Sequence, residues 1–203
     1  MNLTMNTTVP TTQNYFLKDN LDKVVSALEN DGMILFPTDT IWGIGCDACN
    51  PTAIERIYNL KKRDRSKPFV LLVDSIEMLK RYAVQIPPRI QTLLSYHTRP
   101  LTVIYAQGQN LPANAMSTEG SVAIRLVQDE LCKQLIRAYD RPLVATSANI
   151  SNEPFPANFG EISSDVIQGV DYVFQHRRDD KTQREPSVIV KYNDKGDLVF
   201  IRE

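Results

Sequence analysis

Two hydrophobic patterns alternate along the chain. In one, apolar residues recur about every 3.6 residues, and in the other they form a short unbroken run. In the segment NLDKVVSALENDG the apolar residues fall on one helical stripe, which Asn20 can cap and Gly32 can end. The next run, MILF, predicts a buried strand that stops at Pro37 and delivers Thr38 to a loop. Two glycines follow in IWGIGC, and they indicate a turn or a close backbone approach.

The same alternation continues through the rest of the sequence. We expect a helix that opens at Pro51 and ends in the cationic stretch Lys61-Lys62-Arg63, and another after Asp74, with Asp74 and Glu77 as its capping pair. Further helices are expected from Pro87-Pro88 to about Tyr96, around 130–139, and after Asn158. Between them the runs FVLLV, LTVIY, SVAIRL, PLVATS and DYVF predict strands, and SVIVKY and LVFI flank NDKG as a terminal hairpin. The pattern predicts an α/β protein with an open, twisted, mixed sheet flanked by helices.

Length and charge restrict what this fold can bind. The 203 residues suit one domain, which we place at 15–203 after a flexible polar tail at 1–14. The tail has neither a basic nor an apolar targeting region, and no apolar run is long enough to span a membrane, so we expect a cytoplasmic protein. The net charge is −1, so any site for an anion must be local.

Cys46 and Cys49 form a C-x-x-C, which fits a redox pair or half of a zinc site. The third cysteine and the two histidines stand at spacings unlike a zinc finger. We therefore predict reduced, partly buried thiols and no metal site, with the redox and metal alternatives left open.

An arginine stands within the strand SVAIRL. Period-two geometry places Arg125 with Ser121 and Ala123 on one face and the apolar residues on the other. A charge on a central strand is costly without an anion, so Arg125 could bind a carboxylate or phosphate in bidentate fashion, or form a structural salt bridge.

Two further polar segments are candidates for the same site. PLVATSANIS brings Ala145, Ser147 and Asn149 to the end of a strand, where open α/β sheets bind ligands, although such a turn can simply satisfy its own backbone. The stretch LKKRDRSK gathers cations that could neutralise a polyphosphate, or only cap a helix end or face solvent. The sequence contains no Walker loop, dinucleotide fingerprint, nucleophile elbow or HExxH motif.

In this order, the segments FPTDTIWGIGCDA, LKKRDRSKPFVLLV, SVAIR, PLVATSANIS and PSVIV resemble the YrdC/TsaC-type threonylcarbamoyl-AMP synthase family, from about Leu17 to Arg202. The resemblance implies a YrdC-like fold with a central, positively charged groove. It also implies a nucleotidyltransferase that makes threonylcarbamoyl-AMP and pyrophosphate from L-threonine, bicarbonate or CO2, and ATP with Mg2+. The product would pass to the threonylcarbamoyl transferase complex that modifies tRNA.

The resemblance also implies roles for individual residues. L-Threonine would be held at the positions of Thr38, Arg125, Ala145 and Ser187, and the catalytic positions would be Lys61 and Arg63. ATP would be held at Arg63, Lys67, Ser121, Ser147, Asn149 and Arg202.

The chain departs from the family pattern at Trp42, Asp64, Leu72 and Val188. Asp64 beside Arg63 could weaken the field for an anion, and Val188 lacks a hydroxyl that could contact a ligand. The chain ends at Glu203, so we expect it to lack the extra C-terminal domain of longer members. The groove would then be closed by the tail or by the loop from Asp64 to Lys67.

Two other functions remain as alternatives. One is a module that binds double-stranded or other RNA through the groove, although the near-neutral charge and the absence of a basic, aromatic stripe argue against it. The other is a paralogue that uses another carbamoyl or acyl-adenylate substrate.

Overall fold

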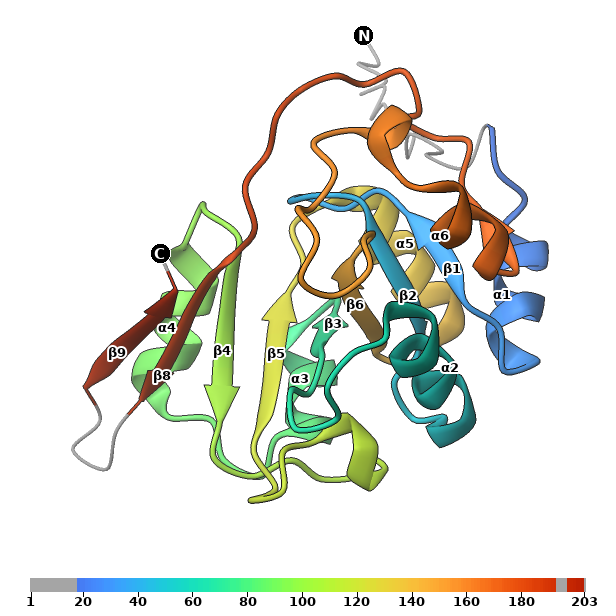
Figure 1. Ribbon diagram of the computed structural model, residues 1–203. Helices are drawn as coiled ribbons and strands as arrows, with labels where there is room; N and C mark the ends of the chain where they lie inside the picture. The colour runs from blue at the N-terminus through green and yellow to red at the C-terminus, as the bar shows by residue number, and fades with distance from the viewer. Residues whose placement is uncertain (1–17, 193–196, 203) are drawn as a thin grey trace, which may run out of the picture.

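The computed structural model describes residues 18–192 and 197–202, which form a nine-stranded sheet with helices packed against it (Figure 1). The strands are β1 Ile34–Phe36, β2 Gly43–Asp47, β3 Val70–Val73, β4 Leu101–Tyr105, β5 Val122–Leu126, β6 Leu143–Ser147, β7 Tyr172–Val173, β8 Val188–Tyr192 and β9 Leu198–Arg202. The helices are α1 Leu21–Glu29, α2 Pro51–Lys61, α3 Ile76–Tyr82, α4 Pro88–Tyr96, α5 Glu130–Tyr139 and α6 Ser164–Gly169, with short 3-10 turns η1 Ala113–Ala115 and η2 Phe159–Glu161.

The strands lie in the order β7-β1-β2-β6-β3-β5-β4-β8-β9. Three neighbouring pairs are parallel, β1 with β7, β3 with β5 and β4 with β8, and the other pairs are antiparallel. The predicted open mixed α/β sheet is therefore confirmed. The loop NDKG and the N-terminal tail lie outside the described residues.

Capping side chains fix where most helices begin. Asn20 accepts a hydrogen bond from the backbone N–H of Lys23 at 3.0 Å, and Asn50 accepts from those of Thr52 and Ala53, so α1 and α2 begin where the sequence predicts. The capping pair predicted before α3 is wrong, because Ser75 and not Asp74 caps the helix. Asp74 instead accepts a hydrogen bond from the Ser75 hydroxyl at 2.8 Å.

The segment expected to be a loop with two glycines is in part a buried strand, β2. The expectation of close backbone approach is correct at Gly45, where a Cβ atom would lie 2.6 Å from the carbonyl oxygen of Val144 and 2.7 Å from the Phe36 ring. Only glycine lets β2 pass between these two groups. The sequence left a turn and a close approach both open, because a glycine required by tertiary packing and a glycine required by a turn have the same local signal.

The two faces of the central strands differ. On one face Val122 and Ile124 of β5 are 1% exposed, and α3 and α5 pack there behind the sheet (Figure 1). On the other face the polar residues of β5 and β6 line a cavity. The segment from β7 to β8 crosses the top of the sheet in Figure 1 and brings Ser187 to this cavity. Among the described helices, none has the length and apolar composition that a bilayer crossing requires.

Candidate functional site

A cavity of about 390 Å³ lies over the middle of the sheet. Its floor follows from the strand register, because Val70 of β3 stands between Ala123 of β5 and Ala145 of β6, and Ile104 of β4 stands beyond Ala123. All four residues line the cavity. The two alanines in this row, Ala123 and Ala145, leave space above the sheet that a ligand could fill.

The charged groups around the cavity all have one sign. Its lining includes three arginines, Arg63, Arg125 and Arg202, and none of the described lining residues is Asp or Glu. A cavity with this lining suits an anionic ligand, although the net charge of the whole chain is −1.

Arg125 is 5% exposed and projects from β5 into the cavity lining. Its Nη1 donates to the Thr40 hydroxyl at 3.0 Å, and its Nη2 lies 3.1 Å from a carboxylate oxygen of Asp39. The Nε–H is buried and has no acceptor among the described residues. Arg125 therefore forms the structural salt bridge that was one alternative, and it retains a donor that could serve the other, the binding of an anion.

Thr38 and Ser187 border the same part of the cavity. The Thr38 hydroxyl donates to the carbonyl oxygen of Ile41 at 2.8 Å and shares a 2.9 Å hydrogen bond with the Thr40 hydroxyl, which links it to Arg125. The Ser187 hydroxyl shares a 2.8 Å hydrogen bond with that of Thr102. These bonds fix the positions of both hydroxyl groups.

Lys61 lies behind the cavity wall and is 1% exposed. Its ammonium donates to the carbonyl oxygens of Ser147 and Asn149, each at 2.5 Å, and to the Asn149 side-chain oxygen at 3.2 Å. Burial lowers the pKa of Lys61 to about 7, and the positive charge of Arg63 acts in the same direction. Lys61 therefore ties the end of α2 to the turn after β6.

The basic loop after α2 is closed by its own hydrogen bonds. Arg63 Nε donates to the carbonyl oxygen of Lys67 at 2.8 Å, and Arg63 Nη2 donates to that of Pro68 at 3.2 Å. Asp64 is exposed and accepts from the backbone N–H of Ser66 at 2.9 Å, and these Ser66 hydrogen bonds lower the pKa of its carboxyl group. The positive charges of Lys67 and Arg63 lower the pKa of Asp64 further, and the Lys67 side chain is exposed.

Arg202 reaches the cavity from β9. Its Nε and Nη2 donate to the carbonyl oxygen of Ser187 at 3.2 and 2.8 Å. Burial lowers the pKa of Arg202, and the positive charge of Arg125 lowers it further. Two arginines thus share one end of the cavity, and their mutual repulsion would fall if an anion bound between them.

The structure gathers most of the predicted site residues but not all of them. Seven line the cavity: Thr38, Arg63, Arg125, Ala145, Ser147, Ser187 and Arg202. Four do not: Lys61, Lys67, Ser121 and Asn149. The Ser121 hydroxyl shares a hydrogen bond with Ser117 at the start of β5, and Asn149 accepts from the Ser147 hydroxyl at 2.5 Å. The sequence reasoning missed Thr40 and Phe155, which also line the cavity.

Three of the residues at which the chain departs from the family pattern do not line the cavity. Leu72 is fully buried in the core, Val188 pairs with Leu101 in the sheet, and Trp42 packs against Phe159 with ring centroids 4.9 Å apart. The missing hydroxyl at Val188 therefore removes no contact from this cavity.

The cysteines are free thiols, and they lie outside the cavity lining. Cys46 is buried within β2, and burial raises its pKa well above the usual range. Cys49 lies with its sulfur 3.8 Å from the Tyr82 hydroxyl. Within residues 18–192 and 197–202, no three His, Cys, Asp or Glu side chains group as metal ligands.

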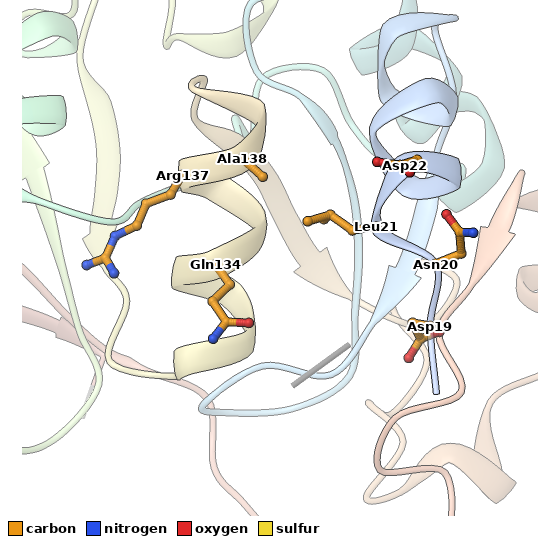
Figure 2. A pocket seen from close by; sticks show the side chains of 7 residues that line it. All are labelled: Asp19, Asn20, Leu21, Asp22, Gln134, Arg137 and Ala138. Carbon is orange, nitrogen blue, oxygen red and sulfur yellow. The ribbon is translucent and has the colours of Figure 1, made fainter. Parts of the chain in front are cut away.

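A second hollow lies between the start of α1 and α5, and its lining is less suited to an anionic ligand (Figure 2). Asp19 and Asp22 line it opposite Gln134, and Figure 2 shows that Arg137 points away from both aspartates. Arg137 is instead paired with Asp74 at 3.0 Å. None of the predicted site residues lies in this hollow.

Comparison with known proteins identifies a family and a shared fold. A family model for Sua5, YciO and YrdC, described as "Telomere recombination", matches residues 26–203. The threonylcarbamoyl-AMP synthase of Vibrio parahaemolyticus is 31% identical over 67% of this chain and 75% of its own length. The threonylcarbamoyl-AMP synthase of Pyrococcus abyssi is 31% identical over 70% of this chain but only 42% of its own length, so the match spans less than half of that relative.

Two solved structures share the fold. Pyrococcus abyssi Sua5 complexed with L-threonine superposes with a TM-score of 0.79 at 24% identity, over 90% of this chain and 53% of that one. Full-length HypF in its phosphate- and nucleotide-bound form gives 0.79 at 22% identity, over 91% of this chain and 29% of that one. By the extent of the family match, this chain belongs to the Sua5, YciO and YrdC family.

Proposed function

We propose that this protein is an L-threonylcarbamoyladenylate synthase, which forms threonylcarbamoyl-AMP and pyrophosphate from L-threonine, bicarbonate or CO2, and ATP. The observation that carries the proposal is the buried Nε donor of Arg125, which has no acceptor among the described residues, on a residue that lines a cavity with two other arginines. A buried donor without an acceptor costs about 1–3 kcal/mol, and a ligand carboxylate would remove that cost.

The end of the cavity near Arg125 suits the amino acid. Its carboxylate would accept from Arg125, while the hydroxyls of Thr38 and Ser187 and the backbone near Ala145 supply polar partners. Relatives named threonylcarbamoyl-AMP synthase and a Sua5 structure that holds L-threonine support threonine as this amino acid.

The opposite part of the wall, around Ser147 and Arg63, suits the phosphates of ATP. Arg63 is already held by two carbonyl oxygens, so its orientation is fixed before a ligand binds. Lys61 fixes the position of Ser147 and of Asn149 from behind. In this proposal Lys61 is a positioning residue, because its three hydrogen bonds all go to the protein.

The reaction then needs positioning and charge neutralisation more than a side-chain nucleophile. The amine of threonine adds to CO2 and loses a proton, which gives a carbamate. A carbamate oxygen attacks the α-phosphorus of ATP, the bond from that phosphorus to the β-phosphate oxygen breaks, and pyrophosphate leaves. Both reactants are anionic, and orienting them among arginines can contribute up to about 7–11 kcal/mol.

The described cavity lining offers no carboxylate, so it does not form a protein-held site for Mg2+. Mg2+ would enter as part of the ATP complex, held by the phosphates, and no step above depends on a metal ligand from the chain. The product is a reactive mixed anhydride, and we propose that the tRNA-modifying threonylcarbamoyl transferase complex consumes it in the cytoplasm.

One assay tests this function. The protein is incubated with labelled ATP, Mg2+, bicarbonate and each of the twenty amino acids in turn, and pyrophosphate and the adenylate are both measured. We expect both products to require threonine. If no adenylate forms in the presence of threonine, the proposal is refuted.

The likeness to HypF supports one second candidate, a paralogue that makes another carbamoyl or acyl adenylate. The same assay with carbamoyl phosphate in place of threonine and bicarbonate distinguishes the two, since only the paralogue would form carbamoyl-AMP. A pure RNA-binding module would form no adenylate in either reaction and would instead bind RNA with a steep dependence on salt.

A further inference from the structure

A large aromatic side chain stands at the edge of the cavity with much of its surface in water. Phe155 is 47% exposed, and it lines the same cavity as Arg63 and Ser147. Tyr96, in contrast, is 81% exposed on α4 and does not line this cavity. A ligand that covered the exposed part of this ring would remove apolar surface from water, which stabilises a complex.

The chain around Phe155 is stiff. Pro154 and Pro156 flank it, so φ is fixed on one side and the conformation of Phe155 itself is restricted on the other. The segment is also tied to the turn after β6, because the side-chain amide of Asn149 donates to the carbonyl oxygen of Glu153 at 2.6 Å. The ring is therefore presented with little conformational entropy to lose when a ligand binds.

Phe155 belongs to the nucleotide side of the cavity. The turn that leads to it carries Ser147 and is bound by Lys61, and Lys61 is two residues from Arg63. Figure 1 shows this segment looping over the face of the sheet, and the backbone N–H of Ser151 donates to the carbonyl oxygen of Lys61 at the end of α2 at 2.9 Å. A flat apolar surface and a fixed guanidinium thus border one space, which matches a nucleotide's base at one end and phosphates at the other.

We propose that Phe155 is the stacking platform for the purine ring of the nucleotide and so determines specificity for the size of the base. This inference rests on the proposed function and adds a residue to it. Base stacking on an aromatic side chain uses the face of the base, and a purine covers more of the ring than a pyrimidine does. Binding should therefore favour ATP over CTP.

Titration calorimetry with Mg2+-ATP and with Mg2+-tripolyphosphate, which lacks a base, tests the inference. The variants are Phe155→Ala, Phe155→Trp and the control Tyr96→Ala, which removes an exposed aromatic far from the cavity lining. We expect Phe155→Ala to weaken ATP binding roughly 5- to 100-fold. Tripolyphosphate binding should stay within twofold, Phe155→Trp should keep ATP binding, and Tyr96→Ala should behave as the wild type.

The outcomes separate this inference from the proposed function. If the wild type binds ATP and Phe155→Ala binds it within twofold as well, the platform is wrong and the synthase proposal stands. Equal losses for ATP and tripolyphosphate would also overturn the platform, because they would indicate a distorted phosphate site. If the wild type binds no ATP, both proposals fail.

Discussion

Lys61 at the end of α2 and Arg125 on β5 are both buried cations, but they differ in where their hydrogen-bond donors go. Lys61 is 1% exposed and Arg125 is 5% exposed, so burial does not distinguish them. The ammonium of Lys61 gives all three of its donors to oxygens of the turn after β6. Arg125, which lines the cavity, donates to Thr40 and pairs with Asp39, and its buried Nε–H has no acceptor among the described residues.

This difference shows that a ligand-binding cation is identified by the hydrogen-bond donors that the protein leaves unsatisfied, and not by its burial. A buried charge whose donors the protein satisfies completely holds the fold, whereas a buried charge on a cavity-lining residue with a donor left over can hold a ligand. We therefore propose that Lys61 acts on the site through the structure of the turn and that Arg125 acts on the ligand directly.

The largest effect is expected at Arg125. The variant Arg125→Lys keeps a positive charge beside Asp39 but loses the planar fork, so kcat/KM for threonine should fall about 100- to 1000-fold while KM for ATP changes little. Steady-state pyrophosphate release measures both constants, and circular dichroism checks the fold. A threonine KM within threefold of the wild type would contradict the role of Arg125.

At Lys61 the comparison predicts a loss of stability. Lys61→Met leaves the carbonyl oxygens of Ser147 and Asn149 without their donor, and we expect the free energy of unfolding to fall by about 2–4 kcal/mol in urea titrations. The control is Lys62→Met, because Lys62 is exposed and should change it by less than about 0.5 kcal/mol. Equal stability of Lys61→Met and wild type would show that these bonds do not hold the turn.

The pH dependence of stability sharpens the same point. The pKa of Lys61 is about 7 in the folded protein against 10.5 for a free side chain, so between these values the unfolded state binds more protons. Stability contributed by this group therefore rises with pH across that window, by about 2 kcal/mol between pH 7 and 9. Urea titrations at both pH values should show this rise in the wild type but not in Lys61→Met, and parallel changes would contradict the lowered pKa.

The smallest effect is expected at Asp64. Its carboxylate is exposed and bonded to Ser66, so Asp64→Asn should alter KM for ATP less than threefold and stability by less than about 0.5 kcal/mol. Kinetic assays at low and high salt measure the first quantity. A KM that falls tenfold at low salt would mean that Asp64 does weaken the field at Arg63.

Periodicity predicted most of the fold because most elements are amphipathic or fully buried. The helix over 130–139 coincides with α5, and the period-two pattern of SVAIRL placed Arg125 on the cavity face. The strand β2 was missed because Gly45 reflects the close approach of the Val144 carbonyl oxygen and the Phe36 ring, which no local pattern contains.

The site could be predicted only in part, for the same reason. A strand pattern specifies the direction of Arg125, but the partners of Lys61 come from a turn 86 and 88 residues further along the chain. Phe155 stands alone between prolines and has no periodic signal at all. Its position at the cavity follows only from the way the turn after β6 folds over the sheet.

The central claim is that Arg125 receives a carboxylate in this cavity, and ligand-observed NMR with L-threonine and L-threoninol tests it most directly. The two compounds differ at the carboxylate, which threoninol replaces with an alcohol. We predict that the wild type binds L-threonine and not L-threoninol, and that Arg125→Lys binds neither. Equal binding of both compounds to the wild type, or undiminished binding of L-threonine to Arg125→Lys, would contradict the claim.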